Sequence, residues 1–198
     1  MTFVILTHPI EFRRRIATGR MSHQSLEGSH LFVGVDFPEN PIIQELVADP
    51  NFQSVVLYPG KNSQNLSLQT PSEKKKCFHS EKHLCVFVID GTWRTARRML
   101  RLNPAIRDLP QISFDPTGPS NFRVRKQPKE NCLSTIEAIH HCIELLGETQ
   151  GFDIQSRKHD NLLRAFDRMV ELQLDFIKQS YAEGRVSRHK LPKAVQSL

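Results

Sequence analysis

An acid, a hydroxyl and the chain's single tryptophan lie close together in the sequence, at Asp90, Thr92 and Trp93. They follow a β-branched and aromatic run, residues 86–89, which predicts a buried strand that ends on Asp90. Gly91 permits a tight turn, and Thr92 can cap a helix that begins at Trp93. Ligands bind at the carboxyl ends of strands in an open α/β sheet, so we expect these side chains at a crevice. A carboxylate there can act as a general base, although aspartate before glycine is also a common turn residue.

The helix that begins at Trp93 carries a strongly basic side. Four arginines recur along it at steps of one, three and four residues: Arg94, Arg97, Arg98 and Arg101. Residues 94–129 hold nine Lys or Arg against two acids, a balance of +7, while the net charge of the whole chain is +6. The excess charge predicts salt-sensitive contacts with the phosphates of a nucleic acid. The alternative is a basic face that only contacts solvent.

Two interpretations of Trp93 stay open. Its spacing with Ala96 and Leu100 places these three residues on one side of the helix, which favours packing in the core. An aromatic ring beside a crevice can instead stack on a nucleobase or on adenine.

Further candidate residues follow the basic helix. Three prolines and Gly118 predict a long loop over 115–131, and loops of this length are usually functional. In this loop Phe122 lies among Ser120, Arg123 and Arg125, an aromatic and basic mixture that suits single-stranded RNA. An arginine there can equally bind a carboxylate. A helix then begins near 133, where Ser134 and Glu137 have the spacing of a capping box.

The segment Asp90, Thr92 and Trp93 resembles the Asp-x-Thr-Trp motif for which the DTW-domain family is named. The resemblance covers about residues 2–145 and includes Leu57-Tyr58-Pro59-Gly60, Ser120–Arg125 and Leu133–Ala138. This family contains tRNA-uridine aminocarboxypropyltransferases, which use S-adenosylmethionine. The resemblance therefore implies transfer of the aminocarboxypropyl group to the ring imide nitrogen of a tRNA uridine, with release of methylthioadenosine.

The resemblance also implies roles for individual residues. Asp90 is expected to be the catalytic base, and Thr92 to orient it or to bind the uracil edge. Contacts with S-adenosylmethionine are expected from Leu57, Tyr58, Pro59, Asp90, Trp93, Ser134, Thr135 and Glu137. Contacts with RNA are expected from Arg94, Arg97, Arg98, Arg101, Arg123, Arg125 and Lys126. His8-Pro9 and Thr18-Gly19-Arg20 resemble family positions in a loop near the cleft, and we expect His8 to be structural.

Strand and helix patterns alternate along the chain, which predicts an α/β fold of one domain, a mostly parallel sheet with helices on both faces. Expected strands cover 3–7, 31–35, 55–58, 86–89 and 111–114, and residues 60–83 are expected to form a surface excursion. Besides the basic helix, expected helices cover 11–17, 41–48, 133–146 and 159–179. The domain is expected to span 1–198, with its core over about 2–182 and a frayed basic tail at 183–198. The resemblance implies a SPOUT-like fold with a trefoil knot.

Composition excludes several classes of protein. Hydrophobic residues at 38% and charged residues at 24% fit a soluble globular protein, and no apolar run approaches the length of a membrane span. The amino terminus lacks a signal-peptide pattern, so we expect a cytoplasmic location. Four cysteines form no C-x-x-C pair and the histidines show no ligand spacing, so we expect reduced thiols and no metal. The oligomeric state is not indicated.

Two other functions stay open. A SPOUT-like RNA methyltransferase would use the same cofactor and a similar fold but would release S-adenosylhomocysteine. A non-catalytic RNA-binding module would release no product. The presence of Asp90, Thr92 and Glu137 counts against the last of these.

Overall fold

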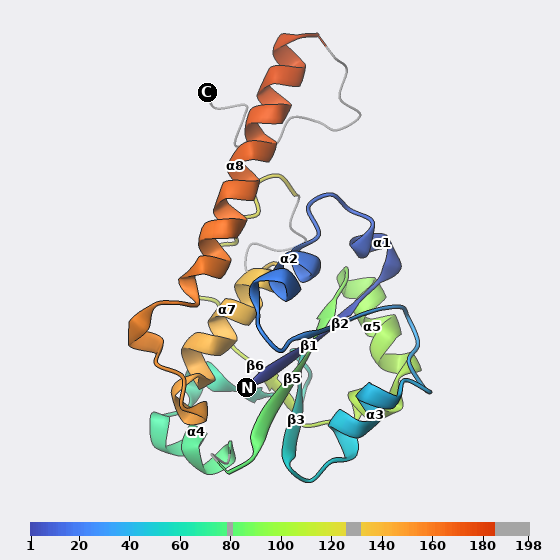
Figure 1. Ribbon diagram of the computed structural model, residues 1–198, viewed down its shortest axis with the longest axis vertical. Coiled ribbons are helices and arrows are strands. Elements are labelled where there is room, and N and C mark those ends of the chain that lie inside the picture. Colours follow the sequence, from blue (N-terminus) through green and yellow to red (C-terminus); the bar gives the residue numbers. More distant parts are fainter. Residues whose placement is uncertain (79–80, 126–131, 185–198) are drawn as a thin grey trace.

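Six parallel strands form the sheet at the centre of the fold (Figure 1). The computed structural model describes residues 1–78, 81–125 and 132–184. The strand order is β2-β1-β5-β3-β6-β4, so β5 lies between β1 and β3. The strands are β1 (Thr2–Thr7), β2 (His30–Val33), β3 (Phe52–Leu57), β4 (Gln64–Asn65), β5 (His83–Asp90) and β6 (Gln111–Ser113).

Helices connect the strands, as a parallel sheet requires. The α-helices are α1 (Pro9–Phe12), α2 (Thr18–Ser25), α3 (Pro41–Ala48), α4 (Pro71–Cys77), α5 (Trp93–Leu102), α6 (Pro104–Arg107), α7 (Thr135–Leu146) and α8 (Asp160–Ala182). The 3-10 helices within the described residues are η1 (Leu66–Leu68), η2 (Glu148–Gln150) and η3 (Ile154–Ser156).

The two faces of the sheet support separate hydrophobic cores, because alternate residues of a strand point to opposite faces. One core joins Leu84, Val86 and Val88 of β5 to side chains of α7 and α8. The other joins Cys85 and Phe87 of the same strand to α3, α5 and α6. Figure 1 shows α2, α7 and α8 on one side of the sheet and α3 and α5 on the other. The expected arrangement of helices on both faces is confirmed.

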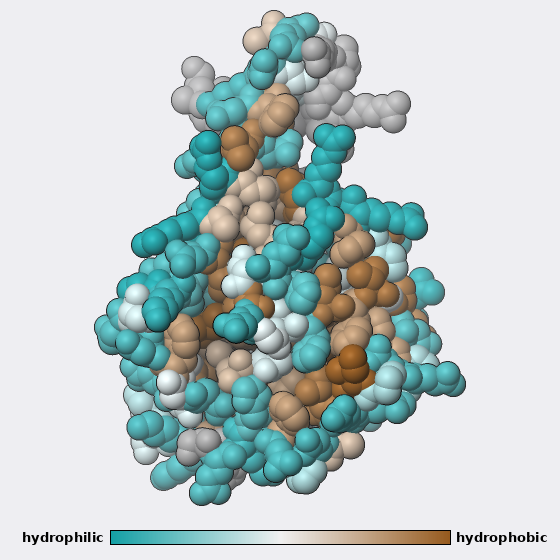
Figure 2. All heavy atoms as spheres, in the orientation of Figure 1, coloured by the Kyte–Doolittle hydropathy of each residue, from teal (hydrophilic) through white to brown (hydrophobic). Residues whose placement is uncertain are grey.

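Helix α8 packs on the body with its first turns and then projects beyond it (Figure 1). Its buried residues recur at every fourth position, at Leu162, Phe166, Val170 and Leu174, which forms one apolar stripe. Figure 2 shows hydrophobic side chains on the projecting part as well, and another group on the right of the body, over β2 and its surroundings. No helix among the described residues is long and apolar enough to cross a membrane.

Most expected elements are present close to their expected bounds, and two expectations are wrong. The helix expected at 11–17 is replaced by α1 and α2, because the His8 side chain accepts from the Ile10 N–H and Pro9 then starts a helix earlier. The expected surface excursion at 60–83 contains β4 and α4, and Leu66 within it is fully buried. Residues 126–131 and 185–198, which include Lys126 and most of the expected tail, lie outside the described residues.

Candidate active site

Asp90 is a buried carboxylate at the carboxyl end of β5. It is 5% exposed and stands beside Thr7, its partner residue on β1. The Thr135 hydroxyl, at the first residue of α7, donates to Asp90 Oδ1 over 2.6 Å. Asp90 Oδ2 is also buried, and it makes no hydrogen bond with any described residue. One carboxylate oxygen is therefore fixed by a protein donor, while the other has its hydrogen-bonding capacity unused.

The surroundings of Asp90 favour its protonated form. Burial raises the pKa of Asp90 above its ordinary value of 3.8, and the negative charge of Glu11 raises it further. The hydrogen bond from Thr135, the nearby Thr7 hydroxyl and the charge of Arg125 lower the pKa and oppose this effect. Burial dominates, so Asp90 is a stronger base when ionised than an exposed aspartate.

Gly19 allows α2 to pack directly against the Asp90 carboxylate. A Cβ atom at position 19 would lie 2.4 Å from Asp90 Oδ2 and 2.7 Å from its Cγ. The family positions Thr18 and Gly19 thus lie in the first turn of a helix and not in the expected loop, and both are buried. Because Gly19 has no side chain, the backbone of α2 lies directly against the Asp90 carboxylate and helps to bury it.

We expect Gly19→Ala to lower the free energy of unfolding, although alanine favours a helix over glycine by about 1 kcal/mol. The added methyl group would overlap the Asp90 carboxylate, and such overpacking costs about 1–3 kcal/mol. Urea denaturation measures the change. Gly118→Ala is the control, because a Cβ there meets nothing within 4 Å. A Gly19→Ala variant that is more stable than the unmodified chain would mean that the carboxylate can move away freely.

Thr92 and Trp93 begin α5 directly after Asp90. The Thr92 hydroxyl accepts from the Thr95 N–H over 3.3 Å, so the expected helix cap is present. Trp93 is 43% exposed, so the core interpretation of this residue is wrong. Its ring lies 6.1 Å from that of Tyr58, and its indole N–H donates to Cys132 Sγ over 3.3 Å. The turn at Gly91 places the indole outside the core and beside the crevice, because α5 packs on the sheet mainly through Ala96, Met99 and Leu100.

Two adjoining cavities lie at this end of the sheet, and they share Gly91, Trp93, Cys132, Leu133 and Thr135. The first is about 280 Å³ and is largely apolar, with further walls from Leu57, Tyr58, Pro59, Val88, Phe114 and Ala138. The second is about 430 Å³, and its further walls include the charged or hydroxyl side chains of Thr18, Asp90, Thr92, Arg94, Arg125 and Ser134. The fold therefore brings most of the expected catalytic and cofactor residues around one bipartite space.

Glu137 does not line either cavity, because its carboxylate accepts hydrogen bonds from other residues of the protein. Its Oε2 accepts from the Ser134 N–H over 2.7 Å and from the Ser134 hydroxyl over 2.6 Å. The same oxygen accepts from the Ser120 hydroxyl, and Oε1 accepts from the Asn121 N–H, each over 2.7 Å. Glu137 thus ties the loop after β6 to the start of α7, a role that the capping-box spacing alone does not reveal.

The loop residues predicted to contact RNA separate into different environments. Phe122 is 2% exposed and packs edge-on against Phe166, so its expected place in an RNA-binding surface is wrong. Arg125 donates two hydrogen bonds of 3.0 Å to the buried carboxylate of Glu11. Arg123 is exposed. The Phe122 side chain lies in the core because the loop passes over the face of the sheet that α8 covers.

The basic side of α5 is exposed, and its arginines Arg94, Arg97, Arg98 and Arg101 form no ion pair with a described residue. Together with Thr95 they border a hollow of about 270 Å³. Arg94 also lines the second cavity, so the basic side is continuous with the space next to Asp90. The contact of these residues with RNA stays a prediction.

Glu11 is the site residue that sequence reasoning missed. It is 4% exposed on the short helix α1, and it also pairs with Arg14 over 3.1 Å. Nothing in the local sequence distinguishes it from a surface glutamate, since its main partner, Arg125, is 114 residues away. The His8 ring accepts from the Ile10 N–H, and the His8 backbone N–H donates to the Asp90 carbonyl oxygen over 2.9 Å, so its structural role stays a prediction.

Comparison with known proteins identifies the family. The DTW domain matches residues 1–174. The chain is 29% identical to tRNA-uridine aminocarboxypropyltransferase 2 of Drosophila melanogaster, over 97% of this chain and 73% of that protein. Proteins of the same name from Macaca fascicularis and Mus musculus are 27% and 25% identical over 71% and 94% of this chain, but over only 42% and 58% of their own lengths. No solved structure matches. Because the family model covers most of the chain and its motif residues surround one crevice, this protein belongs to the DTW-domain family.

Proposed function

We propose that this protein is an enzyme that transfers the aminocarboxypropyl group of S-adenosylmethionine to the imide nitrogen of a uridine in tRNA. The three relatives are each named for aminocarboxypropyl transfer to tRNA uridine. The observation that carries the proposal is Asp90, a buried carboxylate with one unpartnered oxygen among the described residues, on the wall of a cavity that adjoins an apolar one.

The residues around the two cavities fit S-adenosylmethionine. The apolar walls formed by Leu57, Tyr58 and Pro59 suit an adenine ring, and Trp93 stands where the two cavities meet. The hydroxyls of Thr18 and Ser134 lie on the polar side, and oxygen atoms there suit an ammonium group. When bound, the cofactor supplies an electrophilic carbon next to its sulfonium.

Asp90 is the proposed base. The uridine imide nitrogen is a weak nucleophile while it is protonated, so its proton must leave as the new carbon–nitrogen bond forms. Thr135 donates to Asp90 Oδ1, which holds the carboxylate in one orientation. Burial raises the pKa of Asp90 and makes the ionised carboxylate a better proton acceptor. Thr92 and Trp93 follow the turn at Gly91 and are proposed to hold the uracil ring beside Asp90.

Product analysis tests this function directly. The purified chain is incubated with transcribed tRNA and S-adenosylmethionine, and the nucleosides and small products are measured by mass spectrometry. Methylthioadenosine together with a uridine enlarged by the aminocarboxypropyl group is the expected result. S-adenosylhomocysteine would identify a methyltransferase instead, and tRNA binding without either product would identify a binding module.

We expect tRNA affinity to fall steeply with salt concentration if the basic side of α5 binds the phosphates. Replacing both Arg98 and Arg101 by Gln should flatten that dependence, because each lost phosphate contact lowers the log–log slope by about 0.7–0.9. Filter binding at several salt concentrations measures the slope. The control replaces two exposed arginines of α8, Arg164 and Arg168, and removes the same charge. Equal slopes for the two double variants would place the RNA elsewhere.

The proposal extends to the chain's topology and location. A SPOUT-like fold with a trefoil knot is supported by the parallel sheet and by the return of the chain after β6 to the end of β5, where Thr135 meets Asp90. Part of that return, residues 126–131, lies outside the described residues, and a crystal structure that traces it would test the knot. A single domain over 1–198 and a cytoplasmic location stay predictions.

A further inference from the structure

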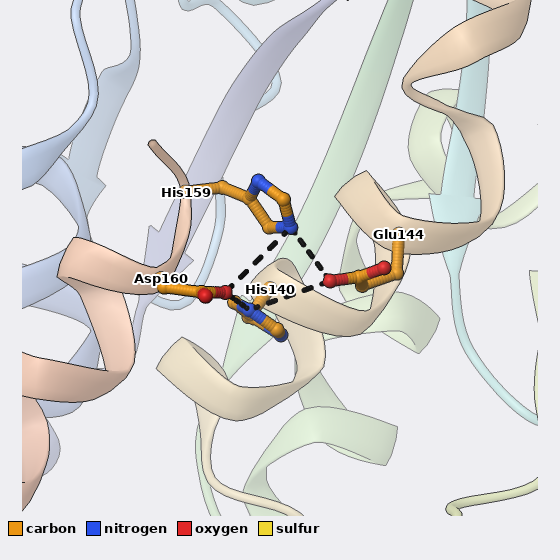
Figure 3. Close-up of side chains that lie close together, drawn as sticks. All are labelled: His140, Glu144, His159 and Asp160. Carbon is orange, nitrogen blue, oxygen red and sulfur yellow. Dashed lines mark hydrogen bonds and ion pairs between the residues drawn. The ribbon is translucent and has the colours of Figure 1, made fainter. Parts of the chain in front are cut away.

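Two histidines and two carboxylates converge where α7 meets the start of α8 (Figure 3). His140 and Glu144 lie one turn apart on α7, so both side chains are on the same side of that helix. His159 and Asp160 stand at the start of α8, and Figure 3 shows all four side chains pointing toward one another. None of them lines the cavities beside Asp90.

The spacing of the four groups is close to that of a metal site. His140 Nε2 is 2.9 Å from Asp160 Oδ1, and His159 Nε2 is 2.6 Å from Glu144 Oε1. The two crossed distances, His140 to Glu144 and His159 to Asp160, are both 3.8 Å, and all four atoms lie within 4.8 Å of one another. Tetrahedral ligands at the usual zinc bond lengths lie about 3.3–3.6 Å apart, so only small side-chain rotations are needed.

Burial and charge at the cluster also favour a cation. The His159 side chain is 1% exposed and that of His140 is 11% exposed, and their ring centres are 4.8 Å apart. Two ring nitrogens and two carboxylate oxygens therefore face one poorly solvated space, where a cation would be attracted by both carboxylates.

Arg157 supplies positive charge to the same carboxylate atoms. Its guanidinium lies 2.5 Å from Glu144 Oε1 and 2.6 Å from Asp160 Oδ1. The two carboxylates therefore face the guanidinium and the two imidazole rings at the same time. The Arg157 side chain is 49% exposed and can turn out to solvent. A metal ion and this arginine would therefore compete for the two carboxylates.

We propose that His140, Glu144, His159 and Asp160 form a tetrahedral Zn²⁺ site that fastens α8 to α7. Two imidazoles and two carboxylates suit zinc, whereas Mg²⁺ and Ca²⁺ take oxygen ligands. Four protein ligands leave no open position, so the ion is structural and not catalytic. It would stabilise α7, the helix whose first residue holds Asp90.

Metal titration of the full chain, without an affinity tag and after treatment with a chelator, tests the proposal. Calorimetry should show one Zn²⁺ per chain, and added Zn²⁺ should raise the melting temperature, because a ligand that binds only the folded state stabilises it. Co²⁺ in the same site should give the visible absorption of tetrahedral cobalt. Absence of zinc binding, or an octahedral cobalt spectrum, would overturn the proposal.

Substitutions separate a metal site from a network of ion pairs. His159→Ala and Glu144→Gln should each weaken zinc binding more than about tenfold. His141→Ala should leave it unchanged, because this neighbouring ring packs on Phe114. Arg157→Ala should strengthen zinc binding, since the competing guanidinium is gone. If Arg157→Ala and His159→Ala both lower stability and neither changes zinc binding, the cluster is only a network of ion pairs.

Discussion

Replacing Asp90 by Asn should lower turnover by about 10²–10⁴-fold, the usual contribution of a positioned general base. The amide keeps the shape of the side chain and an oxygen that can accept from Thr135, but it cannot take a proton. We therefore expect affinity for S-adenosylmethionine to change little. The rate of methylthioadenosine release in steady state measures the effect. Asp175→Asn, at an exposed position on α8, is the control and should keep full turnover.

The same variant should be more stable than the unmodified chain at neutral pH. Burial raises the folded-state pKa of Asp90 above its ordinary value of 3.8, so folding disfavours the ionised form. The contribution of the protonated carboxyl to the free energy of unfolding is therefore fully present when the pH is below the ordinary pKa of 3.8. This contribution is lost as the pH rises through the folded-state pKa. Asparagine carries no charge at any pH, so the stability gain should disappear in acid. Unchanged turnover with increased stability would remove Asp90 from the mechanism and leave it as a buried polar residue.

The sheet and its two covered faces could be predicted because β1, β2, β3 and β5 contain short apolar runs between polar segments, whereas β4 is polar and was missed. The run at 86–89 becomes the centre of β5, with alternate residues in the two cores. Local capping signals were equally informative for α3, where Asn40 accepts from the Ile43 N–H and Pro41 starts the helix at its expected residue. The helix at 11–17 failed because apolar periodicity over so few residues does not identify a helix end.

The site could be predicted only as far as its motif residues. Asp90, Thr92 and Trp93 adjoin the crevice because the end of a parallel strand must face it. The partners of these residues come from distant segments, and no local pattern indicates them. Gly19 packs on Asp90, Glu11 binds Arg125, and Thr135 donates to Asp90 only because the fold brings their helices together.

Glu137→Ala should lower the free energy of unfolding by at least about 1.5–3 kcal/mol, the value of one hydrogen bond to a charged group. The carboxylate accepts four hydrogen bonds, so its removal takes this acceptor away from the N–H groups of Asn121 and Ser134. Urea denaturation measures the loss. Glu148→Ala, at an exposed position in η2, is the matched control and should have little effect.

The conservative variant Glu137→Gln distinguishes support of the loop from contact with the cofactor. Glutamine keeps one acceptor oxygen but turns an N–H₂ group toward one set of donors, since the two carboxylate oxygens accept from different N–H groups. If Glu137 supports the loop, stability should fall in the Gln variant as well, and affinity for S-adenosylmethionine, measured by calorimetry, should fall with it. Lower affinity with unchanged stability would instead mean that the carboxylate leaves its protein donors and binds the cofactor's ammonium group. The four short hydrogen bonds at Glu137 favour the first result, because binding the ammonium would take their shared acceptor away from the N–H groups of Asn121 and Ser134.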